Sequence, residues 1–80
     1  MMNIKILGGG CKNCITLYEY VEEATKELGV SAEIEKVTEF KDILSFGVMK
    51  TPGLVVDGVV KISGRVPSKN EVAKVIKEAL

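Results

Sequence analysis

Histidine and tryptophan are absent from this sequence of 80 residues, and cysteine occurs only twice. Without histidine, no imidazole can act as a general base, activate a cysteine or bind a metal ion. Two cysteines are too few for the disulfide framework of a small secreted scaffold, which usually needs about four or more. In a reducing compartment, two cysteines three positions apart instead indicate a redox site or a metal site.

An excess of charge and long apolar runs are also missing. Lys plus Arg and Asp plus Glu number 11 each, so the formal net charge is zero. Because nucleic acids and anionic membranes reward a strong positive excess, we expect neither as a partner. No apolar run approaches the roughly 20 residues of a membrane-spanning helix, and we expect no signal peptide at the start. The sequence therefore predicts one cytoplasmic domain over residues 1–80.

The first half of the chain predicts a strand, a helix and a second strand. Residues 3–7 form a short, apolar-rich segment that leads into Gly8-Gly9-Gly10, which is typical of a strand that ends in a turn. From Cys11 onward, apolar residues recur at helical spacing until Gly29, which predicts a helix and its end. Residues 30–35 then alternate apolar and polar side chains, as in a half-buried strand. The predicted inner stripe of the helix comprises Cys14, Leu17, Tyr18, Val21, Thr25 and Leu28.

The second half predicts a short helix, a hairpin and a closing helix. Thr38 is expected to cap the short helix, and Gly47 to end it. Asp57-Gly58 separates two apolar runs, a strong signal for a hairpin. Ser68 and Glu71 form a capping box in front of the last helix. From these segments, the side chains expected to point inward are Phe40, Ile43, Leu44, Phe46, Val72, Val75, Ile76 and Ala79.

The resulting order of elements, βαβαββα, predicts the α/β fold class. A strand–helix–strand connection normally makes its two strands parallel, with a right-handed crossover. The hairpin adds an antiparallel pair, and helices are available for both faces of the sheet. The prediction is a three-layer α/β/α domain with a four-stranded mixed sheet.

Three motifs connect this order of elements to a known family. Cys11-Lys12-Asn13-Cys14 follows the first predicted strand, Thr51-Pro52 precedes the third, and Gly64 follows the fourth. Over essentially its whole length, the sequence resembles the small prokaryotic thioredoxin-like and glutaredoxin-like proteins of the type called redox-active disulfide proteins. The resemblance implies a thioredoxin-like fold and a monomeric thiol–disulfide oxidoreductase. Its partners would be protein disulfides and a separate reductase, with no bound cofactor.

Cys11 and Cys14 are the candidate catalytic residues. A helix N-terminus carries partial positive charge and unpaired N–H groups, so a thiolate placed there is stabilised and its pKa falls. Cys11 precedes the helix and is expected to be the exposed thiol that attacks a substrate disulfide. Cys14, on the inner stripe, would resolve the mixed disulfide. Lys12 is expected to lower the pKa of Cys11 further, to an extent that solvent screening limits.

The resemblance also implies a substrate-docking site. In the family, the proline that matches Pro52 is in the cis form and packs opposite the two cysteines. The N–H and C=O of the preceding residue, here Thr51, would pair with an extended substrate as an added strand does. From the sequence alone, an ordinary trans proline at the start of a strand is the other possibility.

Several positions differ from typical thioredoxins and glutaredoxins. The spacer between the cysteines is Lys12-Asn13 rather than Gly-Pro, and Gly10 stands where a tryptophan precedes the first cysteine. The first predicted strand offers Lys5 in place of an assisting carboxylate, and we expect that side chain to be solvated. The glutathione-binding pattern is incomplete. The redox potential and partners of those relatives therefore do not transfer to this sequence.

Two other functions stay open. Cys11 and Cys14 could bind a soft metal or metalloid, Cu(I) or arsenite, because small copper chaperones also carry Cys-x-x-Cys between a strand and a helix. Those domains have the order βαββαβ and usually a methionine where this sequence has Gly9. Alternatively, the cysteines are inert buried side chains and the fold serves only as a docking domain.

The remaining motifs receive structural interpretations. Gly8-Gly9-Gly10 lacks the spacing of a dinucleotide or phosphate loop, so we expect it to let the chain turn and leave the cysteine uncovered. The acidic face of the first predicted helix is interpreted as a solvated surface. Lys50 and Arg65 belong to loops expected near the cysteines, where they could steer an acidic partner.

Overall fold

The computed structural model describes residues 1–8 and 10–80, so Gly9, which the copper-chaperone comparison singled out, lies outside the described residues. The strand order of the sheet is β2-β1-β3-β4, with β1 parallel to β2 and with β1–β3 and β3–β4 antiparallel. The predicted βαβαββα order is confirmed, and the last element is a helix rather than the closing strand of a copper chaperone. The elements are β1 (Met2–Leu7), α1 (Lys12–Leu28), β2 (Ala32–Val37), α2 (Phe40–Ser45), β3 (Gly53–Val56), β4 (Val59–Ser63) and α3 (Lys69–Glu78).

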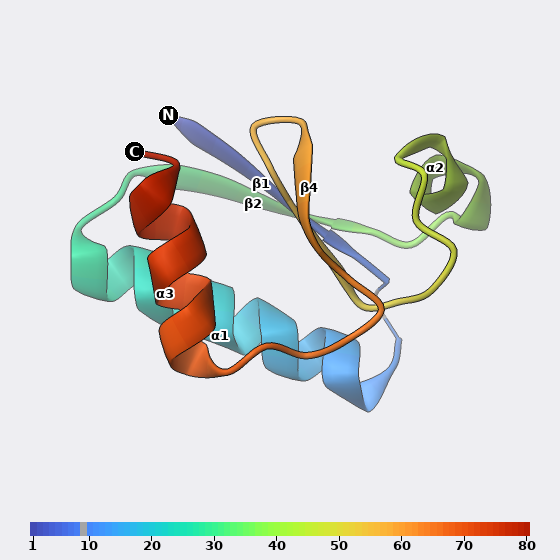
Figure 1. Cartoon of the computed structure of the whole chain (residues 1–80), viewed down its shortest axis with the longest axis horizontal. Helices are drawn as coiled ribbons and strands as arrows, with labels where there is room; N and C mark the ends of the chain where they lie inside the picture. The colour runs from blue at the N-terminus through green and yellow to red at the C-terminus, as the bar shows by residue number, and fades with distance from the viewer. Residues whose placement is uncertain (9) are drawn as a thin grey trace.

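The helices form the outer layers of the fold, as predicted. In Figure 1, α1 and α3 lie beside each other along one side of the sheet, and α2 lies apart from them near the far ends of β1 and β2. Alternation along β1 sends Ile4 and Ile6 toward α1 and α3, and sends Leu7 toward α2. The main core therefore lies between the sheet and α1 with α3, and a smaller core lies under α2.

Several predicted boundaries are confirmed by local geometry. Gly29 ends α1 in the left-handed conformation, and Asp57 with Gly58 forms the turn of the β3–β4 hairpin. Ser68 caps α3 by accepting a hydrogen bond from the N–H of Glu71. Of the predicted inner stripe of α3, Val72 and Ile76 are fully buried, and Val75 and Ala79 pack partly buried against the same core.

The short helix α2 differs from its prediction. The N-cap residue is Glu39, which makes no side-chain capping hydrogen bond, so the cap predicted at Thr38 is wrong. Ile43 is buried, whereas Phe40 is 67% exposed and Leu44 is 41% exposed. A helix of six residues makes fewer than two turns, so it has room for little more than one side chain directly on the sheet.

The inner stripe of α1 is correct except at its last residue. Cys14, Leu17, Val21 and Thr25 are buried, and Tyr18 packs partly buried against the main core. Leu28 is 37% exposed and lines an open surface hollow together with the chain ends Met1 and Leu80. Within the described part of the chain, no helix has both the length and the apolar character needed to cross a bilayer.

Candidate functional site

The two cysteines lie where β1 passes into α1. Cys11 is the N-cap residue of α1, and Cys14 lies in its first turn. Their sulfurs form a disulfide, with an S–S distance of 2.09 Å and a Cα–Cα distance of 5.1 Å. Cys11 is exposed, whereas Cys14 is 2% exposed and faces the protein interior. Cys11 therefore faces solvent while Cys14 faces the interior, as the sequence predicts.

The start of α1 favours negative charge on the exposed sulfur. The backbone N–H of Cys14 donates a hydrogen bond to the Sγ of Cys11 at 3.1 Å, so the sulfur takes the role of a capping acceptor. No acidic residue lies in the first turn of α1, and the exposed Lys12 is its first residue. A thiolate formed at Cys11 on reduction would meet this donor and the positive end of the helix dipole.

Gly8 brings the buried sulfur close to the loop that precedes β3. A Cβ placed on Gly8 would lie 2.8 Å from the Sγ of Cys14 and 2.9 Å from the Cβ of Thr51. Gly8 also has a φ of +100°, a conformation that L side chains rarely adopt. Cys14 and Thr51 therefore both occupy the space beside Gly8 that a side chain at this position would need.

The loop before β3 presents its backbone at the site. The Thr51-Pro52 peptide bond is cis, as the resemblance implies. Thr51 is exposed and Pro52 is buried. Among described residues, no backbone hydrogen bond outside the helices and strands engages the N–H or C=O of Thr51. The carbonyl of Pro52 instead accepts a hydrogen bond from the N–H of Gly64, at 2.9 Å.

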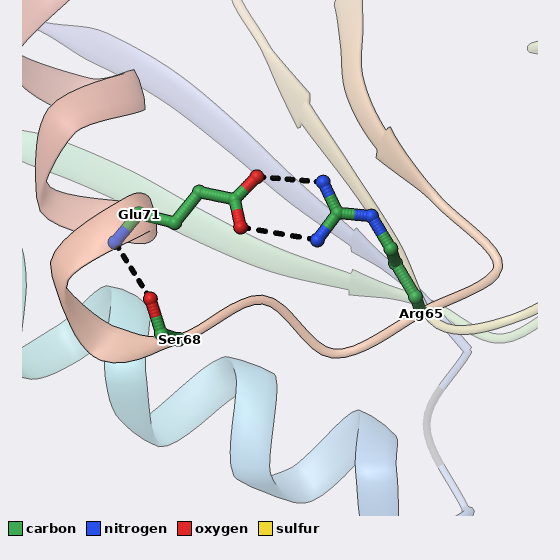
Figure 2. Close-up of polar contacts among 3 residues, drawn as sticks. All are labelled: Arg65, Ser68 and Glu71. Carbon is green, nitrogen blue, oxygen red and sulfur yellow. Dashed lines mark hydrogen bonds and ion pairs between the residues drawn. The ribbon is translucent and has the colours of Figure 1, made fainter.

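The two basic loop residues predicted near the cysteines, Lys50 and Arg65, make different contacts. Lys50 is exposed, and its Cβ would lie 3.3 Å from a Cβ placed on Gly64. Arg65 donates two hydrogen bonds to the carboxylate of Glu71, at 3.1 and 2.6 Å (Figure 2). The sequence predicted Arg65 to be near the cysteines but did not predict this partner. The sequence pattern predicted a capping box of the Glu71 side chain with Ser68, a contact within the helix, and so did not pair it with Arg65.

Lys5 lies on the sheet rather than at the cysteine pair. Its side chain is 27% exposed and forms an ion pair of 3.2 Å with Glu35 on the neighbouring strand β2. The prediction of a solvated lysine is therefore correct only in part, because the charge is shared with a carboxylate.

Two further observations bear on whether the cysteines could bind a metal ion. In the described residues, no group of three or more Cys, Asp, Glu or His side chains gathers in a way that could hold a metal ion. The two sulfurs are bonded to each other in this structure. A metal bound by these two sulfurs would need the reduced form, in which they are thiolates rather than a disulfide.

Comparisons with known proteins extend over nearly the whole chain. A family model described as "Thioredoxin domain" matches residues 2–77. A thioredoxin of Methanothermobacter thermautotrophicus is 51% identical over 76 residues, which are 95% of this chain and 99% of that protein. A thioredoxin of Methanocaldococcus jannaschii is 41% identical over 80 residues, which are 100% of this chain and 92% of that protein. A probable thioredoxin of the former organism is 32% identical over 73 residues, 88% of this chain and 85% of that protein.

Proposed function

The chain belongs to the thioredoxin family, and from this membership we propose that it is a thiol–disulfide oxidoreductase in which Cys11 attacks and Cys14 resolves. The observation that carries the assignment of roles is the difference in exposure between the two sulfurs. Cys11 is exposed at the N-terminus of α1, and Cys14 is 2% exposed beneath it. A substrate disulfide can reach the first sulfur directly, whereas the second can react only with its neighbour.

The exchange proceeds in two steps that transfer two electrons to the substrate. The Cys11 thiolate attacks one sulfur of the substrate disulfide, so a mixed disulfide forms and the other substrate sulfur leaves as a thiolate. The Cys14 thiolate then attacks the Sγ of Cys11. The second substrate sulfur leaves, it takes up a proton, and the Cys11–Cys14 disulfide forms as seen in this structure. A separate reductase must supply two electrons to restore the dithiol.

Thr51 and Pro52 are proposed to hold the substrate during the first step. An extended substrate segment would pair with the N–H and C=O of Thr51 as an added strand does. Two observations support this role: the exposure of Thr51, and the position of its side chain beside Gly8, where the Sγ of Cys14 also lies. Lys12 is proposed to favour the Cys11 thiolate through its charge, in addition to the hydrogen bond from the Cys14 N–H.

The partners follow from this chemistry. A member of this family acts on protein disulfides and is recycled by a reductase, and we propose that this chain does so as a monomer in the cytoplasm. Cys11 and Thr51 are both exposed, which suits a protein substrate that presents its disulfide in an extended segment. Neither step needs a bound cofactor, because both electrons pass through sulfur.

The test is reduction of a model protein disulfide, such as insulin, with dithiothreitol as the electron source. We expect the wild type to accelerate reduction and the Cys11→Ser variant to be inactive. The Cys14→Ser variant should accumulate a mixed disulfide through Cys11 that mass spectrometry detects. If Cys11→Ser retained activity, or if Cys14→Ser trapped nothing while remaining folded, the assigned roles would be wrong.

A further inference from the structure

The loop between β4 and α3 lies against the proposed substrate dock. The N–H of Gly64 donates to the carbonyl of Pro52 at 2.9 Å, and a Cβ on Gly64 would lie 3.3 Å from the Cβ of Lys50. Gly64 also has a φ of +76°, so its backbone reaches the loop in a conformation that favours glycine. The hydrogen bond continues the pairing of β3 with β4, in which Gly53 lies opposite Ser63, so residues 50–52 lie against the start of the β4–α3 loop.

Glu71, in the first turn of α3, binds Arg65, the loop residue that follows Gly64. The hydroxyl of Ser68 accepts a hydrogen bond from the N–H of Glu71 at 3.1 Å, which fixes the start of the helix. In a full capping box, the carboxylate of Glu71 would turn back to the N–H of Ser68. Instead it accepts both hydrogen bonds from Arg65, and Figure 2 shows the guanidinium reaching from the loop to the helix in this two-pronged arrangement.

The same turn of α3 is also tied to the helix that carries the cysteines. Lys69 lies 2.9 Å from a carboxylate oxygen of Glu23 and 3.0 Å from one of Glu27, both on α1. Hydrogen bonds to Glu23 and Glu27 raise the pKa of Lys69 to about 12, so the two carboxylates favour its charged form. Beneath it, Val72 packs in the main core with Leu17 of α1.

The first turn of α3 thus contacts both α1, which carries Cys14, and the β4–α3 loop, which contacts the substrate dock. Lys69 and Val72 hold α3 to α1, on which Cys14 lies, and Glu71 holds Arg65 beside Gly64. Gly64 in turn holds the carbonyl of Pro52.

We propose that Glu71 is a positioning residue that sets the Thr51 backbone relative to Cys11 by holding Arg65. The inference rests on the proposed function, since it needs Thr51 to bind an extended substrate. Among the described residues, the hydrogen bonds of Arg65 and Glu71 join them to each other and to the start of α3 and none joins them to a sulfur, so the proposed effect is on the placement of the dock.

This role has a distinct kinetic signature. A protein substrate that pairs with Thr51 needs the dock in place, whereas a small disulfide needs only an accessible Cys11. An exposed ion pair usually contributes little to global stability, although bidentate geometry places a pair at the upper end of that small range. Loss of the pair should therefore weaken binding of protein substrates and leave the reaction at the sulfurs unchanged.

The experiment compares Glu71→Gln with the wild type on two substrates, insulin and a small aromatic disulfide. Gln keeps the size of the side chain and removes the charge. We expect the KM for insulin to rise about threefold to fivefold, with kcat and the rate on the small disulfide unchanged. Arg65→Gln should behave in the same way. The reversed pair, Arg65→Glu with Glu71→Arg, should recover most of the loss.

The matched control is Glu35→Gln, which breaks the exposed Lys5–Glu35 ion pair on the sheet and should change neither rate. A wild-type KM for insulin in Glu71→Gln would overturn the inference and leave the proposed function intact. An equal loss on both substrates would also overturn it, because the defect would then lie at the cysteines or in the fold. Failure of the wild type on both substrates would instead reject the proposed function, and the inference with it.

Discussion

The backbone of Gly8 lies against the buried sulfur of Cys14, so closely that an added Cβ would be 2.8 Å from it. The same Cβ would be 2.9 Å from the Cβ of Thr51, and φ at this position is +100°. Gly8→Ala combines backbone strain with a contact that both neighbours must relieve. We expect it to lower the free energy of unfolding of the oxidised protein by about 3 kcal/mol, measured by denaturant titration.

Gly10→Ala is the matched control for this prediction. A Cβ on Gly10 meets no atom within 4 Å, so the change should alter the free energy of unfolding by less than about 0.5 kcal/mol. If the two alanine variants unfolded at the same denaturant concentration, close packing of Gly8 against Cys14 would not be needed for the fold.

The sequence predicted most of the fold because its signals are local. Helix periodicity, the stop at Gly29 and the Asp57-Gly58 turn each depend on neighbouring residues, and each is found in the structure. The exposed and buried positions of Cys11 and Cys14 follow from the same periodicity, since the first precedes the helix and the second lies on its inner stripe.

The errors and omissions involve contacts between distant segments. Phe40 has the spacing of a core residue, but as the first residue of α2 it is 67% exposed, because its burial depends on how that short helix packs on the sheet. Glu71 satisfies the local rule for a capping box, yet an arginine six residues earlier takes its carboxylate. The approach of Gly8 to Thr51 joins segments more than 40 residues apart, and no periodicity in a single sequence reports it.

The revised inner face of α1 makes a prediction about stability. Leu17 is fully buried in the main core, so Leu17→Ala should lower the free energy of unfolding by about 2–5 kcal/mol. Leu28 has the same spacing in the sequence but is 37% exposed, and Leu28→Ala should cost less than about 1 kcal/mol. Chemical denaturation of both variants measures the difference. Equal losses would show that the end of α1 is buried after all.

The Arg65–Glu71 pair should give the stability a dependence on acidic pH. Hydrogen bonds from Arg65, and to a lesser extent the charges of Arg65 and Lys74, lower the pKa of Glu71. A lowered pKa in the folded state adds stability at neutral pH, and this gain is lost as the pH falls through the pKa that Glu71 has in the folded protein. That window lies below about pH 4.3, the ordinary value for glutamate.

The measurement is the difference in melting temperature between the wild type and Glu71→Gln as a function of pH. The wild type should melt higher by a small, constant amount from neutral pH down to about pH 5, and the two curves should converge below about pH 4. Curves that stayed parallel through the acidic range would mean that the carboxylate charge of Glu71 contributes nothing to the pair.

The effect of Lys12 on the exposed thiol can be separated from that of the helix itself. In a Cys14→Ser background Cys11 is the remaining thiol, and its alkylation rate at neutral pH reports its thiolate fraction. Lys12 is exposed beside it, so we expect Lys12→Gln to slow alkylation by about twofold at low ionic strength, and less in high salt. Lys77→Gln, at the far end of α3, removes an equal charge and should leave the rate unchanged. Since the net charge of both variants is the same, an equal slowing in both would indicate a general charge effect and would remove Lys12 from the site.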